Sequence, residues 1–158
     1  MPRAANRLSP LPVDDDQFLQ YLRVVQDAND AGLHTLDEIA KHCLTSEITM
    51  ANGSNYKRSN YRAVLGNLGR LGFIVEDDDN AQLRGICKQY LNNEFEPKSK
   101  SNKHKQLPPF GILFLECMQE MGIENIDPYI IDQLSYFSDT IRKEDADFKW
   151  SNKLILSK

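Results

Sequence analysis

Residues 62–83 constrain the fold more strongly than any other part of the chain. Apolar residues recur there at helical spacing until Gly72, a residue type that commonly ends a helix. The apolar residues 73–75 then predict a strand, the acidic run 76–80 predicts a turn, and residues 81–84 predict a returning strand. A helix that leads directly into a β-hairpin is therefore expected in the middle of the chain.

Two helices are predicted before this stretch, and a third leads into the hairpin. Three consecutive aspartates supply an N-cap and favourable first-turn charge to a first helix that ends at Gly32. Thr35 and Glu38 form a capping box for a second, short helix. The third helix is expected at residues 58–72, and a fourth follows the hairpin at 85–93. The inward face of the third helix consists of Tyr61, Val64, Leu65, Leu68 and Leu71.

Helix, short helix, helix and hairpin is the order of elements in a winged helix-turn-helix, and we predict such a domain over residues 14–95. Residues 1–13 lack periodicity and predict a flexible N-terminal arm. The charged segment 96–106 predicts a basic linker, and residues 107–158 a helical hairpin or second helical subdomain. The expected fold class is mainly α: a winged helix-turn-helix with a small β-hairpin wing, followed by a C-terminal helical hairpin. The alternative is an unrelated helical domain with a chance hairpin.

Composition places the chain among ordinary globular proteins. It is 41% apolar and 27% charged, which is enough apolar material for a core. No run of about 18 apolar residues predicts a membrane span, and the N-terminus lacks the apolar region of a secretory signal. Three cysteines without a CxxC pair predict reduced thiols and a cytoplasmic protein.

The net charge of −4 conceals a segregation of charge along the chain. Residues 1–50 carry four Lys and Arg against eight Asp and Glu, and residues 106–158 carry five against nine. Residues 51–105 carry ten against six, so the positive charge is concentrated in the middle third. Such a surface can bind phosphates; the alternative is that it is simply solvated.

Sequence motifs for catalysis or metal binding are absent. The chain contains no P-loop, GxGxxG, GxSxG or HExxH motif, and His34, His42 and His104 lack the partners that a zinc site needs. The acidic turn lacks the spacing of a calcium loop. Residues 144–149 contain the carboxylates and lysine of a metal-dependent nuclease without the strand setting. We therefore expect no enzymatic activity, no cofactor and no metal.

The third helix offers the best candidate for a binding surface. In a helix-turn-helix the N-terminal end of this helix reaches the bases of the major groove, where arginine can bond guanine with two hydrogen bonds. With the apolar face turned inward, the polar residues of the helix share its outer face. We expect double-stranded DNA to be bound by Lys57, Arg58, Ser59, Asn60, Arg62 and Arg70. The linker is expected to add phosphate contacts from Lys98, Lys100, Lys103 and Lys105.

Two alternatives to DNA binding remain open. These polar residues fit equally the exposed face of an ordinary amphipathic helix. The predicted wing tip, residues 76–80, carries four acidic groups that a phosphate backbone would repel. Either the wing points away from DNA, or the domain binds protein instead. A homo-oligomer or a larger protein partner would then be bound through residues 107–137, and no membrane is expected as a partner.

About half of the chain resembles the DNA-recognition regions of type IIS restriction and nicking endonucleases. There, a winged helix with leucine, glycine and an aliphatic residue before the wing precedes a polar spacer. An apolar helix preceded by proline and a second helix-turn-helix-like segment follow the spacer. The corresponding pieces here are residues 68–75, 82–91, 98–106, 107–122 and 126–137. The resemblance implies a recognition module without the nuclease domain that such enzymes also carry.

Overall fold

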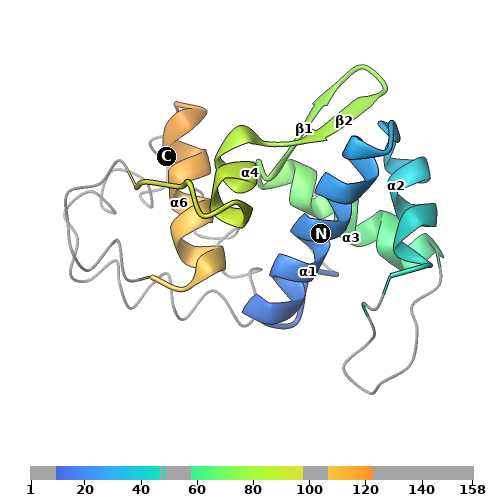
Figure 1. Ribbon diagram of the computed structural model, residues 1–158, viewed down its shortest axis with the longest axis horizontal. Helices are drawn as coiled ribbons and strands as arrows, with labels where there is room; N and C mark the ends of the chain where they lie inside the picture. The colour runs from blue at the N-terminus through green and yellow to red at the C-terminus, as the bar shows by residue number, and fades with distance from the viewer. Residues whose placement is uncertain (1–9, 47, 49–57, 98–106, 123–158) are drawn as a thin grey trace, which may run out of the picture.

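The computed structural model describes residues 10–46, 48, 58–97 and 107–122. This part of the chain is mainly α, with five helices and one antiparallel hairpin (Figure 1). The elements in chain order are α1 (Asp15–Asp30), α2 (Leu36–Cys43), α3 (Arg58–Arg70), β1 (Ile74–Asp77), β2 (Asn80–Leu83), α4 (Gly85–Leu91) and α6 (Pro109–Glu120). None of the described helices has both the length and the apolar character needed to cross a membrane.

The first two helices begin at the side-chain caps that the sequence predicts. The Asp14 carboxylate accepts a hydrogen bond of 2.9 Å from the Gln17 N–H at the start of α1. Thr35 and Glu38 form the predicted capping box at the start of α2. Backbone N–H groups of His34 and Thr35 donate to the Glu38 carboxylate and lower its pKa. These bonds fix the orientation of the first turn of α2.

The hairpin is tighter than the sequence predicts. Asp77 pairs with Asn80, so only Asp78 and Asp79 form the turn, and Asp78 has a φ of 57°. The predicted five-residue turn over 76–80 is therefore wrong at both of its ends. A two-residue turn matches the twist of the strands it joins, and Asp tolerates the positive φ that this turn requires.

The outer edge of β2 is bonded to the segment between α1 and α2. The Ala81 N–H donates to the carbonyl of His34. The Asn29 amide donates to the carbonyls of Leu33 (2.9 Å) and Ala81 (3.1 Å), and its oxygen accepts from the Leu83 N–H (3.0 Å). One side chain of α1 therefore satisfies the strand edge that a third strand would otherwise pair.

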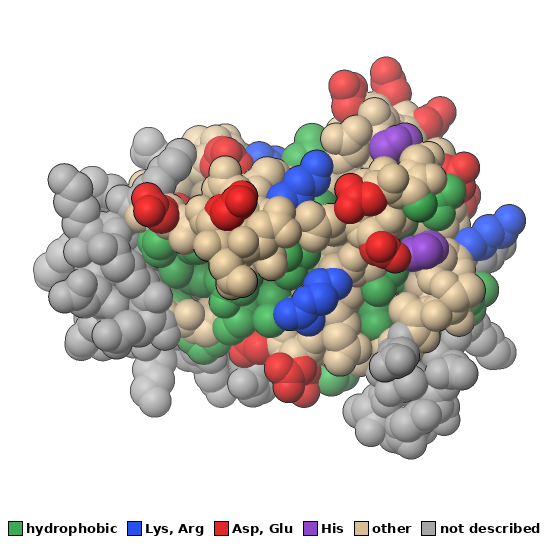
Figure 2. Space-filling model, in the orientation of Figure 1, with side chains coloured by type: hydrophobic (Ala, Val, Ile, Leu, Met, Phe, Trp, Pro, Cys, Tyr) green, Lys and Arg blue, Asp and Glu red, His purple; other side chains and the backbone are tan. Residues whose placement is uncertain are grey.

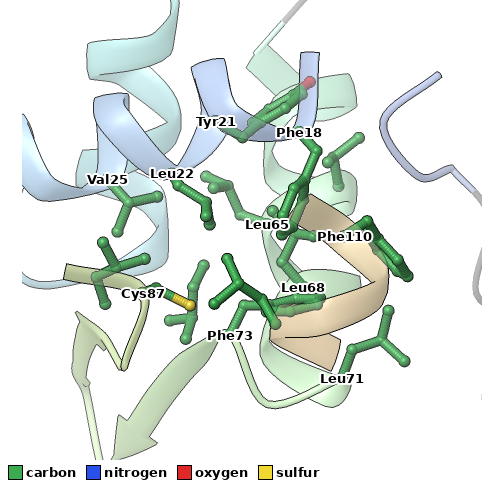
Figure 3. Packing of buried hydrophobic residues seen from close by; sticks show 14 of the residues in the cluster. Phe18, Tyr21, Leu22, Val25, Leu65, Leu68, Leu71, Phe73, Cys87 and Phe110 are labelled. Atoms are coloured by element: carbon green, nitrogen blue, oxygen red, sulfur yellow. The ribbon is translucent and has the colours of Figure 1, made fainter. Parts of the chain in front are cut away.

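Three phenylalanines from distant parts of the sequence meet in the core (Figure 3). Phe18 of α1 lies edge to face against Phe73, at 4.8 Å between ring centroids, and against Phe110 of α6 at 5.0 Å. Phe73 and Phe110 meet at 5.3 Å. The Phe110 N–H also donates to the Asp15 carboxylate at 2.9 Å. The apolar helix after the linker therefore shares one core with the elements before it.

The burial of α6 bears on the partner expected through residues 107–137. Residues 110–118 of α6 are all buried, including Glu116. The described half of that segment thus directs its apolar side chains into the interior of its own chain. The second predicted helix of the C-terminal hairpin lies outside the described residues.

We expect Asn29→Ala to destabilise the protein by about 1–3 kcal/mol, because it leaves the Leu83 N–H and the Ala81 carbonyl without their partner. Urea unfolding monitored by circular dichroism measures the change. The matched control is Asn92→Ala, since the Asn92 side chain is exposed, and it should change the free energy of unfolding by about 0.5 kcal/mol or less. Equal effects of both substitutions would show that the bonds of Asn29 do not hold the hairpin.

Candidate nucleic-acid interface

Helix α3 presents one face to the core and the opposite face to solvent, as its apolar spacing predicts. The inward side chains are fully or almost fully buried, and they are Tyr61, Val64, Leu65 and Leu68. Ser59, Arg62, Ala63 and Arg70 are exposed, and Asn60 is half-buried. Of the predicted DNA-binding residues, Ser59, Arg62 and Arg70 therefore share the exposed side of one helix.

Several predicted DNA-binding residues lie outside the described part of the chain. Arg58 is the first residue of α3, but its side chain is not described. The residues outside the described ranges are Lys57, Lys98, Lys100, Lys103 and Lys105. The part of the interface that can be built from contacts is therefore the outer face of α3 and its neighbours.

Arg62 is held by an acidic residue that sequence reasoning missed. Its Nε donates to Oδ1 of Asp37 at 3.2 Å, across 25 residues of sequence. Both side chains remain largely exposed, at 46% for Arg62 and 73% for Asp37. A surface pair of this kind contributes about 0–1 kcal/mol to stability, which is enough to favour one orientation of the guanidinium.

The guanidinium of Arg62 lies along the surface of α3. An ideal Cβ built on Gly66, one turn further on, would be 3.3 Å from Nη1 of Arg62. Gly66 therefore provides the space in which the guanidinium rests close to the helix.

Asp37 is placed by the local structure of α2. It is the second residue of the helix and lies within the capping box, between Thr35 and Glu38, while the nearby Leu36 and Ile39 turn into the core. With these two apolar side chains buried, the carboxylate of Asp37 points outward to α3. The contact could have been anticipated only from the packing of α2 on α3, because no spacing in the sequence connects the two residues.

The hairpin brings further carboxylates to this face. A hollow of about 130 Å³ lies between α2, α3 and the hairpin, and Arg62 is its only Lys or Arg among the described residues. Its acidic lining residues are Asp37, Glu76, Asp78 and Asp79. The Glu76 carboxylate reaches over Gly69 of α3, where an ideal Cβ would be 2.7 Å from Oε2. Figure 2 shows carboxylates gathered at the tip of the projecting hairpin. We name the four carboxylates that line this hollow, Asp37, Glu76, Asp78 and Asp79, the acidic rim.

Arg70, at the other end of α3, has a different environment. Its Nη1 donates to Oδ1 of Asn67 at 3.3 Å. Asn67 is buried, and its own amide donates to the carbonyl of Pro10 at 2.9 Å. Arg70 thus lies on the exposed side of α3 and outside the lining of the hollow that holds Arg62.

A second, larger hollow of about 420 Å³ lies on the opposite face of the hairpin, against α4 and α6. Arg84 lines this hollow; its Nε donates to the carbonyl of Gly72 at 2.6 Å, and its Nη1 donates to Glu120 at 3.0 Å. These bonds give Arg84 a structural role, since they join the hairpin, α4 and α6. Lys88 also lines this hollow.

The described residues contain neither a metal-binding cluster nor an exposed cysteine. No group of three His, Cys, Asp or Glu side chains in the described ranges is placed to hold a metal ion. All three cysteines are buried, and burial raises the pKa of Cys43 to about 12. A hydrogen bond with Cys117, together with burial, raises the pKa of Cys87. Thiols in such surroundings are poor nucleophiles at neutral pH.

Comparison with protein families, with curated proteins and with solved structures finds no match to this chain. Its function is therefore inferred from the geometry of its own surface. The candidate surface is the exposed face of α3, where Arg62 lies next to the acidic rim.

We expect Gly69→Ala to stabilise the protein by roughly 0.5–1 kcal/mol, because alanine is the better helix residue and the Glu76 carboxylate can swing aside. Gly72→Ala should instead destabilise it, since Gly72 has a φ of +96° and a Cβ there would meet Cε of Met121 at 2.5 Å. Thermal unfolding of the two variants checks both signs. A clear loss of stability in Gly69→Ala would mean that Glu76 is fixed in place.

Proposed function

We propose that this protein is a non-catalytic double-stranded DNA-binding module that reads DNA through α3. The observation that carries the proposal is the exposed side of α3, where Ser59, Arg62 and Arg70 face outward from a helix whose other side forms the core. Ala63 and Gly66 lie among them, and because both residues are small, another molecule can approach the helix closely. A polar helix face that carries arginines, with small residues between them, suits insertion into the major groove.

The arrangement of elements supports a winged helix-turn-helix as the architecture. Helices α1, α2 and α3 precede the hairpin, and α2 packs on α3. The bond from Ala81 to the His34 carbonyl joins the segment between α1 and α2 to the outer edge of the hairpin. In this arrangement α3 is the recognition helix and the hairpin is the wing.

Each residue of the exposed face has a role in the proposal. Arg62 reads a base, and Ser59 and Asn60 contact bases or phosphates at the N-terminal end of α3. Arg70 holds a phosphate. Lys57 and the linker lysines supply further phosphate contacts. Such a module would serve as the recognition part of a restriction-type system or as a regulator.

The acidic rim favours a second candidate function, a protein-interaction or oligomerisation module. Glu76, Asp78 and Asp79 share a hollow with Arg62, so the hairpin does not carry its charge away from the face that would meet DNA. Phosphates close to these carboxylates are repelled, whereas a basic protein segment is attracted. The rim therefore lowers the affinity of α3 for DNA in general, and it fits a cationic partner.

Selection of duplexes from a random pool at moderate salt tests the first function. We expect one sequence to be enriched, with an affinity that falls steeply as salt is added. Arg62→Ala should weaken binding of the selected duplex by about 1–3 kcal/mol, and Arg70→Ala should weaken all duplexes alike. Lys88→Ala is the control, because it removes one positive charge from the opposite face of the hairpin. Equal binding by Arg62→Ala and the wild type would refute the role of Arg62.

The triple variant Glu76→Gln, Asp78→Asn, Asp79→Asn separates the two functions. If DNA is the partner, removing these charges raises the affinity for every duplex. If a basic protein is the partner, the wild type binds a lysine-rich peptide, and the triple variant binds it more weakly. Fluorescence anisotropy with labelled duplex and labelled peptide measures both. A wild type that binds the peptide and enriches no duplex would replace the first function by the second.

A further inference from the structure

The bond between Arg62 and Asp37 uses only one side of the guanidinium. Nε donates to Asp37 at 3.2 Å, and neither Nη1 nor Nη2 donates to any described residue. The guanidinium is planar and rigid, so a carboxylate on Nε favours one direction for the two terminal nitrogens. Within the described ranges, the two terminal nitrogens of Arg62 are thus left as a pair of donors in one preferred plane.

The surroundings of Arg62 limit its movement further. The guanidinium rests beside Gly66, where any Cβ would crowd Nη1 at 3.3 Å. Asp37 itself belongs to a turn held by the capping box and by the buried Leu36 and Ile39. Both partners of the bond are thus anchored to helices that pack on each other. A side chain held in its binding geometry loses less conformational entropy when it binds.

The free donors match one base edge in the major groove. Guanine presents two acceptors there, O6 and N7, at the spacing of the two terminal nitrogens of arginine. Adenine presents one acceptor and one donor, and it cannot receive both hydrogen bonds. The chemistry of the held arginine therefore selects guanine.

We infer that Asp37 is a positioning residue that orients Arg62 to read a guanine in the major groove. The inference rests on the proposed DNA-binding function and names the base recognised by α3. Asp37 contacts no DNA base in this mechanism, and it acts only through the Nε of Arg62. Its carboxylate also repels phosphates, so it opposes non-specific binding while it supports recognition of guanine.

Glu76 provides a matched control for the charge of Asp37. Both carboxylates line the same hollow, but only Asp37 bonds Arg62. Removal of either charge lowers the repulsion of phosphates. Only the loss of Asp37 releases the guanidinium, so the two effects can be separated by comparing duplexes.

The experiment uses the full chain and three labelled duplexes: the selected sequence, the same sequence with its conserved G·C pair changed to A·T, and a random sequence. The preference for guanine is the ratio of the first two affinities. In Asp37→Ala this ratio should fall about two- to fivefold, the range for one exposed ion pair, while affinity for the random duplex rises. In Glu76→Gln, affinity for all three duplexes should rise and the ratio should stay unchanged.

A double-mutant cycle shows whether Asp37 acts through Arg62. In the Arg62→Ala background, Asp37→Ala should not change the guanine preference further, because the side chain that it positions is gone. Asp37→Asn keeps the shape of the side chain and should give a smaller fall than Asp37→Ala. Thermal unfolding of each variant identifies any loss of folding, and Asp37→Asn serves for the comparison if Asp37→Ala unfolds.

The possible outcomes distinguish this inference from the function on which it rests. If the wild type binds a selected duplex and Asp37→Ala keeps the same guanine preference, the positioning role is overturned and the DNA-binding function stands. The same holds if the selected sequences contain no conserved guanine. If the wild type binds no duplex above the level of the random sequence, the proposed function fails and the inference fails with it.

Discussion

Phe73 packs against both Phe18 and Phe110, which also contact each other, and much of the described surface depends on this cluster of three rings. Phe73 directly precedes the first strand of the hairpin, so its burial fixes where the hairpin leaves the core. Because α3 ends only three residues earlier, the same contact also fixes the C-terminal end of that helix. Aromatic pairs in this geometry contribute about 0.5–1.5 kcal/mol each beyond the burial of their area. The three rings therefore fix the base of the hairpin next to α3, while the bonds of Asn29 and His34 hold the outer edge of β2.

Much of the fold could be predicted from the sequence because its signals are local. Helical spacing of apolar residues and the caps at Asp14 and Thr35 predict α1, α2 and α3 to within about two residues of the observed bounds. The turn of the hairpin could not be predicted from polarity, since Glu76 and Asp77 pair as strand residues despite their charge. Strand pairing there depends on the two-residue turn and on packing against α3. The winged helix-turn-helix itself stays a prediction.

The candidate site was less predictable because its key contact joins distant residues. Helical spacing identifies Ser59, Arg62 and Arg70 as the outward side of α3, and the structure agrees. Nothing in the spacing connects Arg62 with Asp37, which lies 25 residues away. The acidic rim likewise depends on how the hairpin folds back toward α2. Net charge along the chain indicated a basic middle third, yet the local surface around Arg62 is acidic. The charge summed over residues 51–105 is thus positive, whereas the surface around Arg62 in the folded protein is acidic.

The bonds of Asn29 have a consequence for how the protein behaves at high concentration. An exposed strand edge is a template on which another chain can pair, and this is a common beginning of aggregation. Asn29 and His34 occupy the backbone groups of Ala81 and Leu83 on the outer edge of β2. Strand β1 instead carries the exposed carboxylates of Glu76 and Asp77, which disfavour pairing with a second copy. A small hairpin that projects from a helical protein is in this way protected on both sides, by an amide on one edge and by charge on the other.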